Sequence, residues 1–186
     1  RLVRLDLKDN LLTGAIPSEV GLLDGLENLR LSGNKFTNRI PSEISRLSGS
    51  LVNLLLEDNL LTGTLPCSEL ASLTLLRTLY LGRNSFGGTI CSSIGGLTHL
   101  ADLDMSRGGL IGTLPVELGD LSGLVNLDLS GNSLSGTLPI DIFTRNRADR
   151  MVLHDNSFSG SISPDIGQLF WLVEVSLGKN MLTEPI

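Results

Sequence analysis

Residues 124–139 read LVNLDLSGNSLSGTLP, and this stretch contains the pattern that decides the fold. Leu127 and Leu129 alternate with polar residues, which is the period-two pattern of a short strand with one buried face. The side chain of Asn132 can bond backbone groups of the turn that follows, and Gly136 permits a tight turn. The stretch therefore predicts a strand, a turn and the start of a return path.

The same order of residues recurs along the whole chain of 186 residues, at spacings of 24 or 25. A single unit cannot bury its apolar face alone, so we expect the units to stack their strands into a parallel sheet, about 4.8 Å apart. The asparagines should form a ladder inside the stack, and Ser18, Ser42 and Ser68 stand where short helical turns would want a cap. Units begin near residues 2, 26, 51, 76, 100, 124, 148 and 172.

Composition favours a repeated core and argues against several partners. Hydrophobic residues make up 41% of the chain but aromatic residues only 4%, so leucine must fill most of the interior. The formal net charge of -6 argues against nucleic acid and against simple adsorption to anionic lipid. The longest apolar run, residues 169–173, is too short to span a membrane.

The repeating unit resembles the plant-specific leucine-rich repeat. Its marker segment, Leu-Thr/Ser-Gly-x-Ile/Leu-Pro, occurs at residues 12–17 and 134–139. The resemblance implies an α/β solenoid: a right-handed superhelix with a parallel concave sheet, a short second sheet formed by the marker segments, and 3-10 or helical turns on the convex side. It also implies an extracellular or cell-surface recognition module, as in ectodomains of receptor-like kinases, receptor-like proteins and related algal proteins.

Several positions depart from this pattern. Gly108 replaces the ladder asparagine of the fifth unit, Ala148 replaces a core leucine, and Glu184 stands where glycine is expected. Family members carry cysteine-paired caps at both ends of the solenoid, and this chain has neither. We therefore expect residues 1–186 to be one solenoid fragment of a longer protein.

Outward side chains of the strands should form columns on the concave face, where solenoids of this kind usually bind. Leu55 and Tyr80 would form a small apolar patch beside arginines, and an aromatic residue beside arginines is typical of a binding hot spot. The alternative is that these are ordinary exposed residues of a sheet. The predicted ligand-binding residues are Arg30, Leu55, Tyr80, Arg83, Asp102, Asp104, Arg107 and Asp128.

Asp102, Asp104 and Asp128 should cluster on this face. Paired carboxylates can serve acid–base chemistry or bind calcium, but a shallow face gives little burial for catalysis. We therefore favour a solvated acidic stripe, which would suit a basic ligand. His154 and Asp155 have no suitably placed nucleophile, so the sequence predicts no enzyme and no cofactor, and its cysteines and histidines make no metal site.

Cys67 and Cys91 lie 24 residues apart in adjacent units. Stacking could bring their α-carbons within range of a disulfide, which would favour an oxidising compartment. The alternative is a pair of free thiols at a loop edge. None of the twelve asparagines begins an Asn-x-Ser/Thr sequon, which counts weakly against secretion.

Two further segments are candidates for contacts at the solenoid edges. Arg145, Arg147 and Arg150 interrupt the repeat, and this basic segment would be either a partner contact or a locally loosened loop. Phe170 and Trp171 replace small or polar residues. As an exposed pair they would indicate an interface, and the alternative is local packing.

Together these observations predict a non-catalytic module that binds a protein or peptide through its concave sheet. Its setting would be extracellular or the cell surface, with a co-receptor or larger assembly as a further partner. The fragment has no predicted membrane span and no nucleic-acid partner. The alternative function is a structural or assembly subunit held through the solenoid edges.

Overall fold

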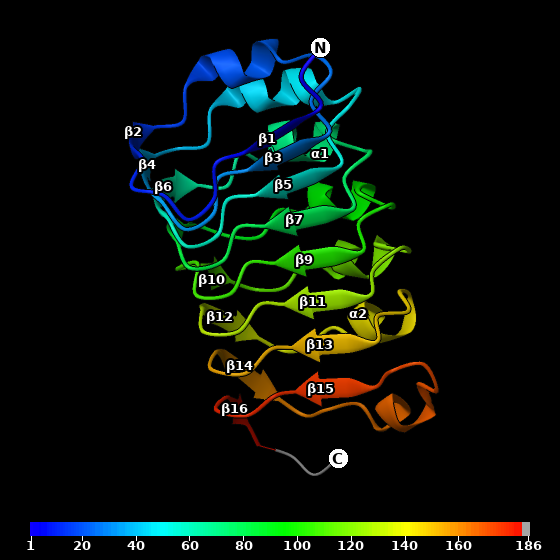
Figure 1. Cartoon of the computed structure of the whole chain (residues 1–186). Coiled ribbons are helices and arrows are strands. Elements are labelled where there is room, and N and C mark those ends of the chain that lie inside the picture. Colours follow the sequence, from blue (N-terminus) through cyan, green and yellow to red (C-terminus); the bar gives the residue numbers. More distant parts are fainter. Residues whose placement is uncertain (184–186) are drawn as a thin grey trace.

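The computed structural model describes residues 1–183 and confirms the stack of repeats (Figure 1). Each unit adds one strand to an eight-stranded parallel sheet, here called the concave sheet. Glu184 lies outside the described residues. The strands follow one another in the order β1 (Arg4–Asp6), β3 (Asn28–Arg30), β5 (Asn53–Leu55), β7 (Thr78–Tyr80), β9 (Asp102–Asp104), β11 (Asn126–Asp128), β13 (Arg150–Val152) and β15 (Glu174–Ser176).

Every pairing in the concave sheet keeps the repeat in register. Leu127 lies opposite Leu103 on one side and Met151 on the other. These inward side chains are at most 2% exposed, so the core runs from unit to unit as one continuous apolar column. The burial of the period-two leucines confirms the strand prediction.

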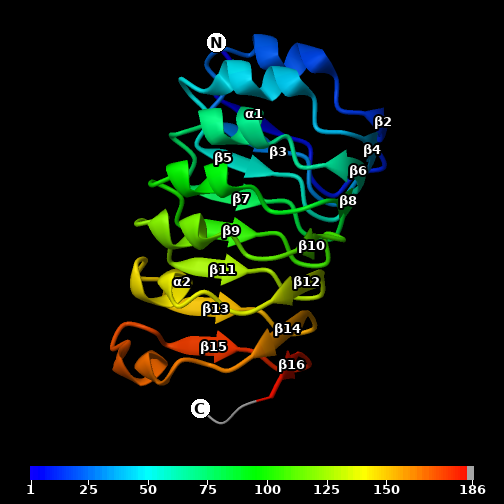
Figure 2. The ribbon, with the colours of Figure 1, turned by 180° about the vertical axis from the view of Figure 1, so that it is seen from behind.

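The marker segments form a second sheet along one side of the concave sheet (Figures 1 and 2). Strand pairing in this sheet is shifted by two residues relative to the repeat. Leu60 is the residue of the third unit equivalent to Ser85 of the fourth, but the residue that pairs with Ser85 is Thr62. The second sheet has two four-stranded parts: β2 (Thr13–Ala15), β4 (Lys35–Asn38), β6 (Leu60–Thr64) and β8 (Ser85–Gly87), then β10 (Ile111–Gly112), β12 (Ser133–Gly136), β14 (Ser157–Gly160) and β16 (Met181–Leu182).

Short helical turns complete the units on the side away from the concave sheet (Figure 2). The predicted serine caps are wrong, because Ser18, Ser42 and Ser68 lie inside these turns and bond the neighbouring glutamates. In these three turns the residue before the first turn residue is a proline, whose ring fixes its own φ angle, and no side chain caps the turn. The turns are η1 (Ser18–Leu22), η2 (Ser42–Leu47), α1 (Cys67–Ser72), η3 (Ser92–Gly96), η4 (Val116–Asp120), α2 (Asp141–Thr144) and η5 (Pro164–Gln168).

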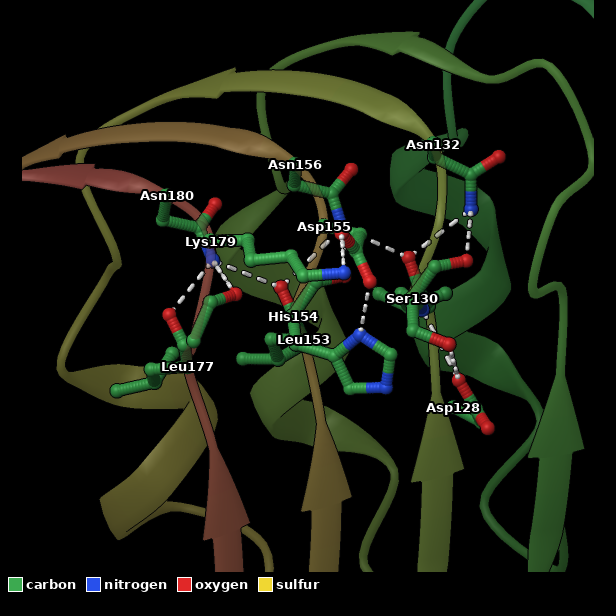
Figure 3. A network of polar contacts seen from close by, with 12 residues as sticks. Asp128, Ser130, Asn132, Leu153, His154, Asp155, Asn156, Leu177, Lys179 and Asn180 are labelled. Atoms are coloured by element: carbon green, nitrogen blue, oxygen red, sulfur yellow. Dashed lines mark hydrogen bonds and ion pairs between the residues drawn. The ribbon is translucent and has the colours of Figure 1, made fainter.

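The predicted asparagine ladder is present (Figure 3). Asn156 donates to the carbonyl of Leu153 in its own unit at 3.2 Å and to that of Leu129 in the preceding unit at 2.9 Å. Its side-chain oxygen accepts from the backbone N–H of Leu134 at 3.0 Å. The equivalent residues Asn34, Asn59, Asn84, Asn132 and Asn180 make the same kind of bonds.

The ladder is interrupted at Gly108, as predicted. Its backbone N–H bonds the side-chain oxygen of Asn132 at 2.9 Å. The next residue, Gly109, has a φ of 74° and approaches Phe86 so closely that an added Cβ would lie 2.5 Å from the Phe86 carbonyl oxygen. The second sheet divides at this same place, between β8 and β10.

The basic segment of the sixth unit is packed, which contradicts the alternative of a loosened loop. Phe143 and Asn146 are 3% and 0% exposed. Phe143 and Asn146 fill the interior of this unit, because Arg145 stands at a position where most other units have a leucine. Arg145 turns outward and pairs with Asp120 at 3.1 Å and with Asp141 at 3.9 Å.

Candidate binding face

The register of the concave sheet places six of the eight predicted binding residues in two columns. Neighbours within a column are direct strand partners, so each column is continuous in space. The first column contains Asp6, Arg30, Leu55, Tyr80, Asp104 and Asp128, and the second contains Asn28, Asn53, Thr78, Asp102, Asn126, Arg150 and Glu174.

A hollow of about 290 Å³ lies over the middle of this face. It brings together four predicted residues, Tyr80, Asp102, Asp104 and Asp128, together with Asn126. Arg150 also lines the hollow, so its prediction as an edge residue is wrong: β13 begins at Arg150 and puts it on the concave sheet.

The three carboxylates are held by local hydrogen bonds. Asp102 accepts from the Asn126 amide at 2.6 Å. Asp104 accepts from the backbone N–H of Ser106 at 2.8 Å. Asp128 is bonded in the same way, by the N–H and the hydroxyl of Ser130 (Figure 3). These bonds fix the positions of the carboxylates without supplying a positive charge.

Burial and crowding of negative charge set the electrostatics of the hollow. Burial raises the pKa of the Asp104 carboxyl. The negative charge of Asp128 raises this pKa further, while the hydrogen bonds from Ser106 lower it. Burial also raises the pKa of the Tyr80 hydroxyl, with further contributions from Asp102, Asp104 and Glu57. Opposed like charges destabilise a sheet, so a cation bound here would relieve their repulsion.

Glu57 belongs to this acidic group, and the sequence reasoning missed it. The side chain is half-buried and burial raises its pKa. Its Oε2 atom is buried, and no hydrogen-bond partner for it is found among residues 1–183. Glu57 lies in a third column, one residue beyond the strand leucine, with Ser32 and Gly82 at the equivalent positions. Aligning that column across the units would have found it.

The predicted apolar patch is present, but the arginines flank it differently. Leu55 lies directly between Arg30 and Tyr80 in the register. Arg83 and Arg107 have φ values of 51° and 49° in the turns after the strands, so they approach from the end of the sheet. Arg83 Nη1 lies 3.4 Å from Asp58 Oδ1, and Arg30 Nη1 lies 3.8 Å from Asp6 Oδ2.

The remaining candidate residues lie away from the hollow. Cys67 and Cys91 form a disulfide whose α-carbons are 6.0 Å apart. Phe170 is 93% exposed, whereas Trp171 is partly buried and packs against the core. Arg147 is exposed beside the packed Asn146. The predicted aromatic pair is therefore split between surface and interior.

His154 and Asp155 take part in an ion-pair network at the turn end of the concave sheet (Figure 3). His154 Nδ1 lies 2.7 Å from Asp155 Oδ2, and Lys179 Nζ lies 3.1 Å from Asp155 Oδ1. Hydrogen bonds from Lys179 and then His154 lower the pKa of the Asp155 carboxyl. In this network Asp155 is the shared partner of His154 and Lys179.

Within residues 1–183, no group of three or more histidine, cysteine, aspartate or glutamate side chains is placed to hold a metal ion. The same residues contain no helix with the length and apolar character needed to cross a membrane.

Comparison with known proteins identifies the repeat. The family model of the leucine-rich repeat matches residues 1–23, 25–47, 75–97 and 123–144. No curated protein sequence gave a significant match. Among solved structures, the plant peptide hormone receptor RGFR1 in complex with RGF2 is 35% identical, with a TM-score of 0.93 over 97% of this chain.

Two further structures show the same fold. The Arabidopsis receptor kinase HAESA, in complex with the peptide hormone IDA and the co-receptor SERK1, is 36% identical with a TM-score of 0.92 over 97% of this chain. A plant ice-binding protein is 26% identical with a TM-score of 0.77, covering 100% of this chain and 66% of its own. This chain spans 29% of the RGFR1 chain and 30% of the HAESA chain. The chain therefore belongs to the leucine-rich-repeat family, with the plant-type solenoid of the receptor ectodomains that it resembles.

Proposed function

We propose that this chain is a non-catalytic binding module that holds a peptide, or an extended segment of a protein, on its concave sheet. The observation that carries the proposal is the hollow of about 290 Å³ lined by Tyr80, Asp102, Asp104 and Asp128. An aromatic wall beside fixed polar groups is the usual composition of a binding hot spot. The similarity to RGFR1 and HAESA, both solved with peptide hormones, supports this function.

The charges of the hollow favour a ligand with a basic side chain. Three carboxylates line it, and the cation beside them, Arg150, is bonded to Glu174 at 2.8 and 3.3 Å. The hollow therefore keeps a negative potential that attracts an arginine or lysine. Tyr80 can pack against the stem of that side chain or face its charge.

The proposed setting is extracellular or the cell surface. The disulfide between Cys67 and Cys91 supports this setting, because such bonds persist in oxidising compartments. The ectodomains among the similar structures point the same way, and the HAESA complex makes a co-receptor a reasonable further partner. Shallow burial of the carboxylates supports binding over catalysis.

A library of random twelve-residue peptides displayed on phage supplies the probe for a test. Peptides enriched on the purified chain are synthesised, and their dissociation constants are measured by calorimetry. We expect enriched peptides to contain arginine or lysine. Asp104→Asn and Tyr80→Ala should each weaken binding by roughly tenfold or more, as truncation of a hot-spot residue does.

The matched control is Glu117→Gln, which removes one negative charge on the convex side, within η4. It should leave the dissociation constants unchanged. If the enriched peptides bind both concave variants with unchanged dissociation constants, the concave site is overturned. If Phe170→Ala instead weakened them, the alternative of an assembly subunit held through its edge would replace it.

Ice is a second candidate ligand. The observation in its favour concerns the second sheet from Leu60 to Ser161: its outward positions are mostly exposed and carry no charged residue. The similarity to a plant ice-binding protein over the whole length of this chain supports the candidate. This function would use a different side of the molecule from the concave sheet.

A further inference from the structure

Each marker segment, with the residue before it, has three outward residues, such as Gly109, Ile111 and Thr113. They alternate with one buried apolar residue and one glycine, here Leu110 and Gly112. In the five units from Leu60 to Ser161, these positions hold mainly serine and threonine, with glycine, one leucine and one isoleucine. We call this surface the hydroxyl face. It runs down one side of the solenoid over β6, β8, β10, β12 and β14 (Figures 1 and 2).

Four threonines of the hydroxyl face have the same side-chain placement. The γ-methyl group of each lies against a glycine of the next unit, so closely that a Cβ added to the glycine would lie only 2.8–3.1 Å away. Because β-branched side chains are stiff about χ1, this contact holds the hydroxyl in one repeated orientation. The four residues, all exposed, are Thr64, Thr89, Thr113 and Thr137.

The hydroxyls of these threonines are left to solvent. Within residues 1–183, Thr144 is the one threonine whose side chain makes a hydrogen bond to another protein group. An exposed hydroxyl that is fixed in orientation can hold a water molecule in a fixed place. A charged side chain would instead keep a tightly bound hydration shell of its own.

The array repeats in two directions. The two-residue offset of the register occurs on both sides of the break between β8 and β10, as in Thr62 with Ser85 before it, and Ile111 with Ser133 and Ser135 with Ser157 after it. Strands lie about 4.8 Å apart, and two residues span about 6.6 Å along a strand. Within each of its two parts, β6–β8 and β10–β14, the face therefore repeats its methyl groups and hydroxyls on an oblique two-dimensional net. A peptide does not repeat in two directions, whereas the surface of a crystal does.

We propose that the hydroxyl face is the surface that contacts ice, through water ordered by its threonine columns. The proposal rests on the second candidate function above and assigns it to particular residues. The concave columns are unsuited to this contact because they mix aspartate, arginine and tyrosine without a repeat. The charged residues Lys35 and Arg39, at the equivalent positions of the second unit, mark one limit of the face.

Inhibition of ice recrystallisation by the purified 186-residue chain tests the proposal, with thermal hysteresis as a second readout. Thr113→Arg places a long cation in the middle of the face. It should raise the concentration needed for inhibition by roughly tenfold or more, as expected for a central interface residue. Thr137→Arg repeats the change one unit further on, in case the first variant does not fold.

The matched control is Thr74→Arg, which makes the same substitution at an exposed residue after α1, away from the second sheet. It should keep wild-type inhibition, and circular dichroism and thermal midpoints verify that the variants are folded. If Thr113→Arg and Thr137→Arg fold and inhibit recrystallisation as well as the wild type does, the hydroxyl face is not the contact surface, although the chain still binds ice. A wild-type chain without any activity on ice overturns both, and leaves the peptide proposal untouched.

Discussion

The carboxyl group of Glu57 lies half-buried on the concave sheet, close to other carboxylates. Burial raises its pKa in the folded chain, so the folded state binds this proton more tightly than the unfolded state does. The resulting stability is fully present below the ordinary pKa of glutamate and is lost as pH rises through the folded pKa. The ionised side chain therefore opposes folding at neutral pH.

We expect Glu57→Gln to make the chain more stable than wild type at pH 7, because the glutamine carries no charge into the site. The difference should disappear below about pH 4, where the carboxyl is protonated in both states. Urea unfolding at a series of pH values measures it. Glu117→Gln serves as the control, and an equal gain from both variants at every pH would rule out burial of Glu57 as the cause.

Tyr80 and the three aspartates could be placed from the sequence because period-two strands in register fix their columns. Glu57 lies in a column that the prediction did not align, and its half-burial is a property of the stacked units and not of its own repeat. Gly82, at the equivalent position of the next unit, has no side chain, and a Cβ there would lie 2.7 Å from Asp104 Oδ1 and 2.9 Å from Ser106 Oγ. This close approach joins two adjacent units, so no single repeat reveals it.

Among the structural elements, strand β11 offers a direct measure of core packing. Leu127 is 1% exposed and is enclosed by Leu103 and Met151. Leu127→Ala should lower the free energy of unfolding by about 2–5 kcal/mol, since it removes buried methyl groups and leaves a cavity. Val125→Ala, at a position 39% exposed, should cost clearly less. Similar costs for the two in urea unfolding would mean that the stack relaxes to fill the space.

The spacing of leucines is enough to predict the strands, and the recurring asparagines predict the ladder, whereas the second sheet follows from the resemblance to the plant-specific repeat. The spacing is not enough to predict where the second sheet divides, because that depends on the backbone around Gly108. The sequence showed that the asparagine is missing there, but not that the chain at Gly109 moves close to Phe86. The predicted serine caps are wrong because the residue before each of η1, η2 and α1 is a proline, so the serine lies within the turn.

On the scale of the whole molecule, each unit touches only its neighbours, so stability depends on position in the stack. The central strand residue Leu79 is fully buried, whereas Leu5 in β1 and Val175 in β15 are only partly buried. Amide hydrogen exchange in this chain should be slowest in β7 and β9 and fastest in β1 and β15. Mass spectrometry of the exchanged peptides measures the gradient, and uniform protection would show that the stack opens as one unit.

The disulfide between Cys67 and Cys91 also matters when the solenoid is under tension. A repeat protein pulled from its ends lengthens by peeling off one unit after another, and 24 freed residues give about 80 Å of extra reach. The covalent bond removes that length from the third and fourth units, because force passes through the sulfur atoms and leaves the loop slack. The molecule thus has a built-in limit to its extension, which a reductant would release.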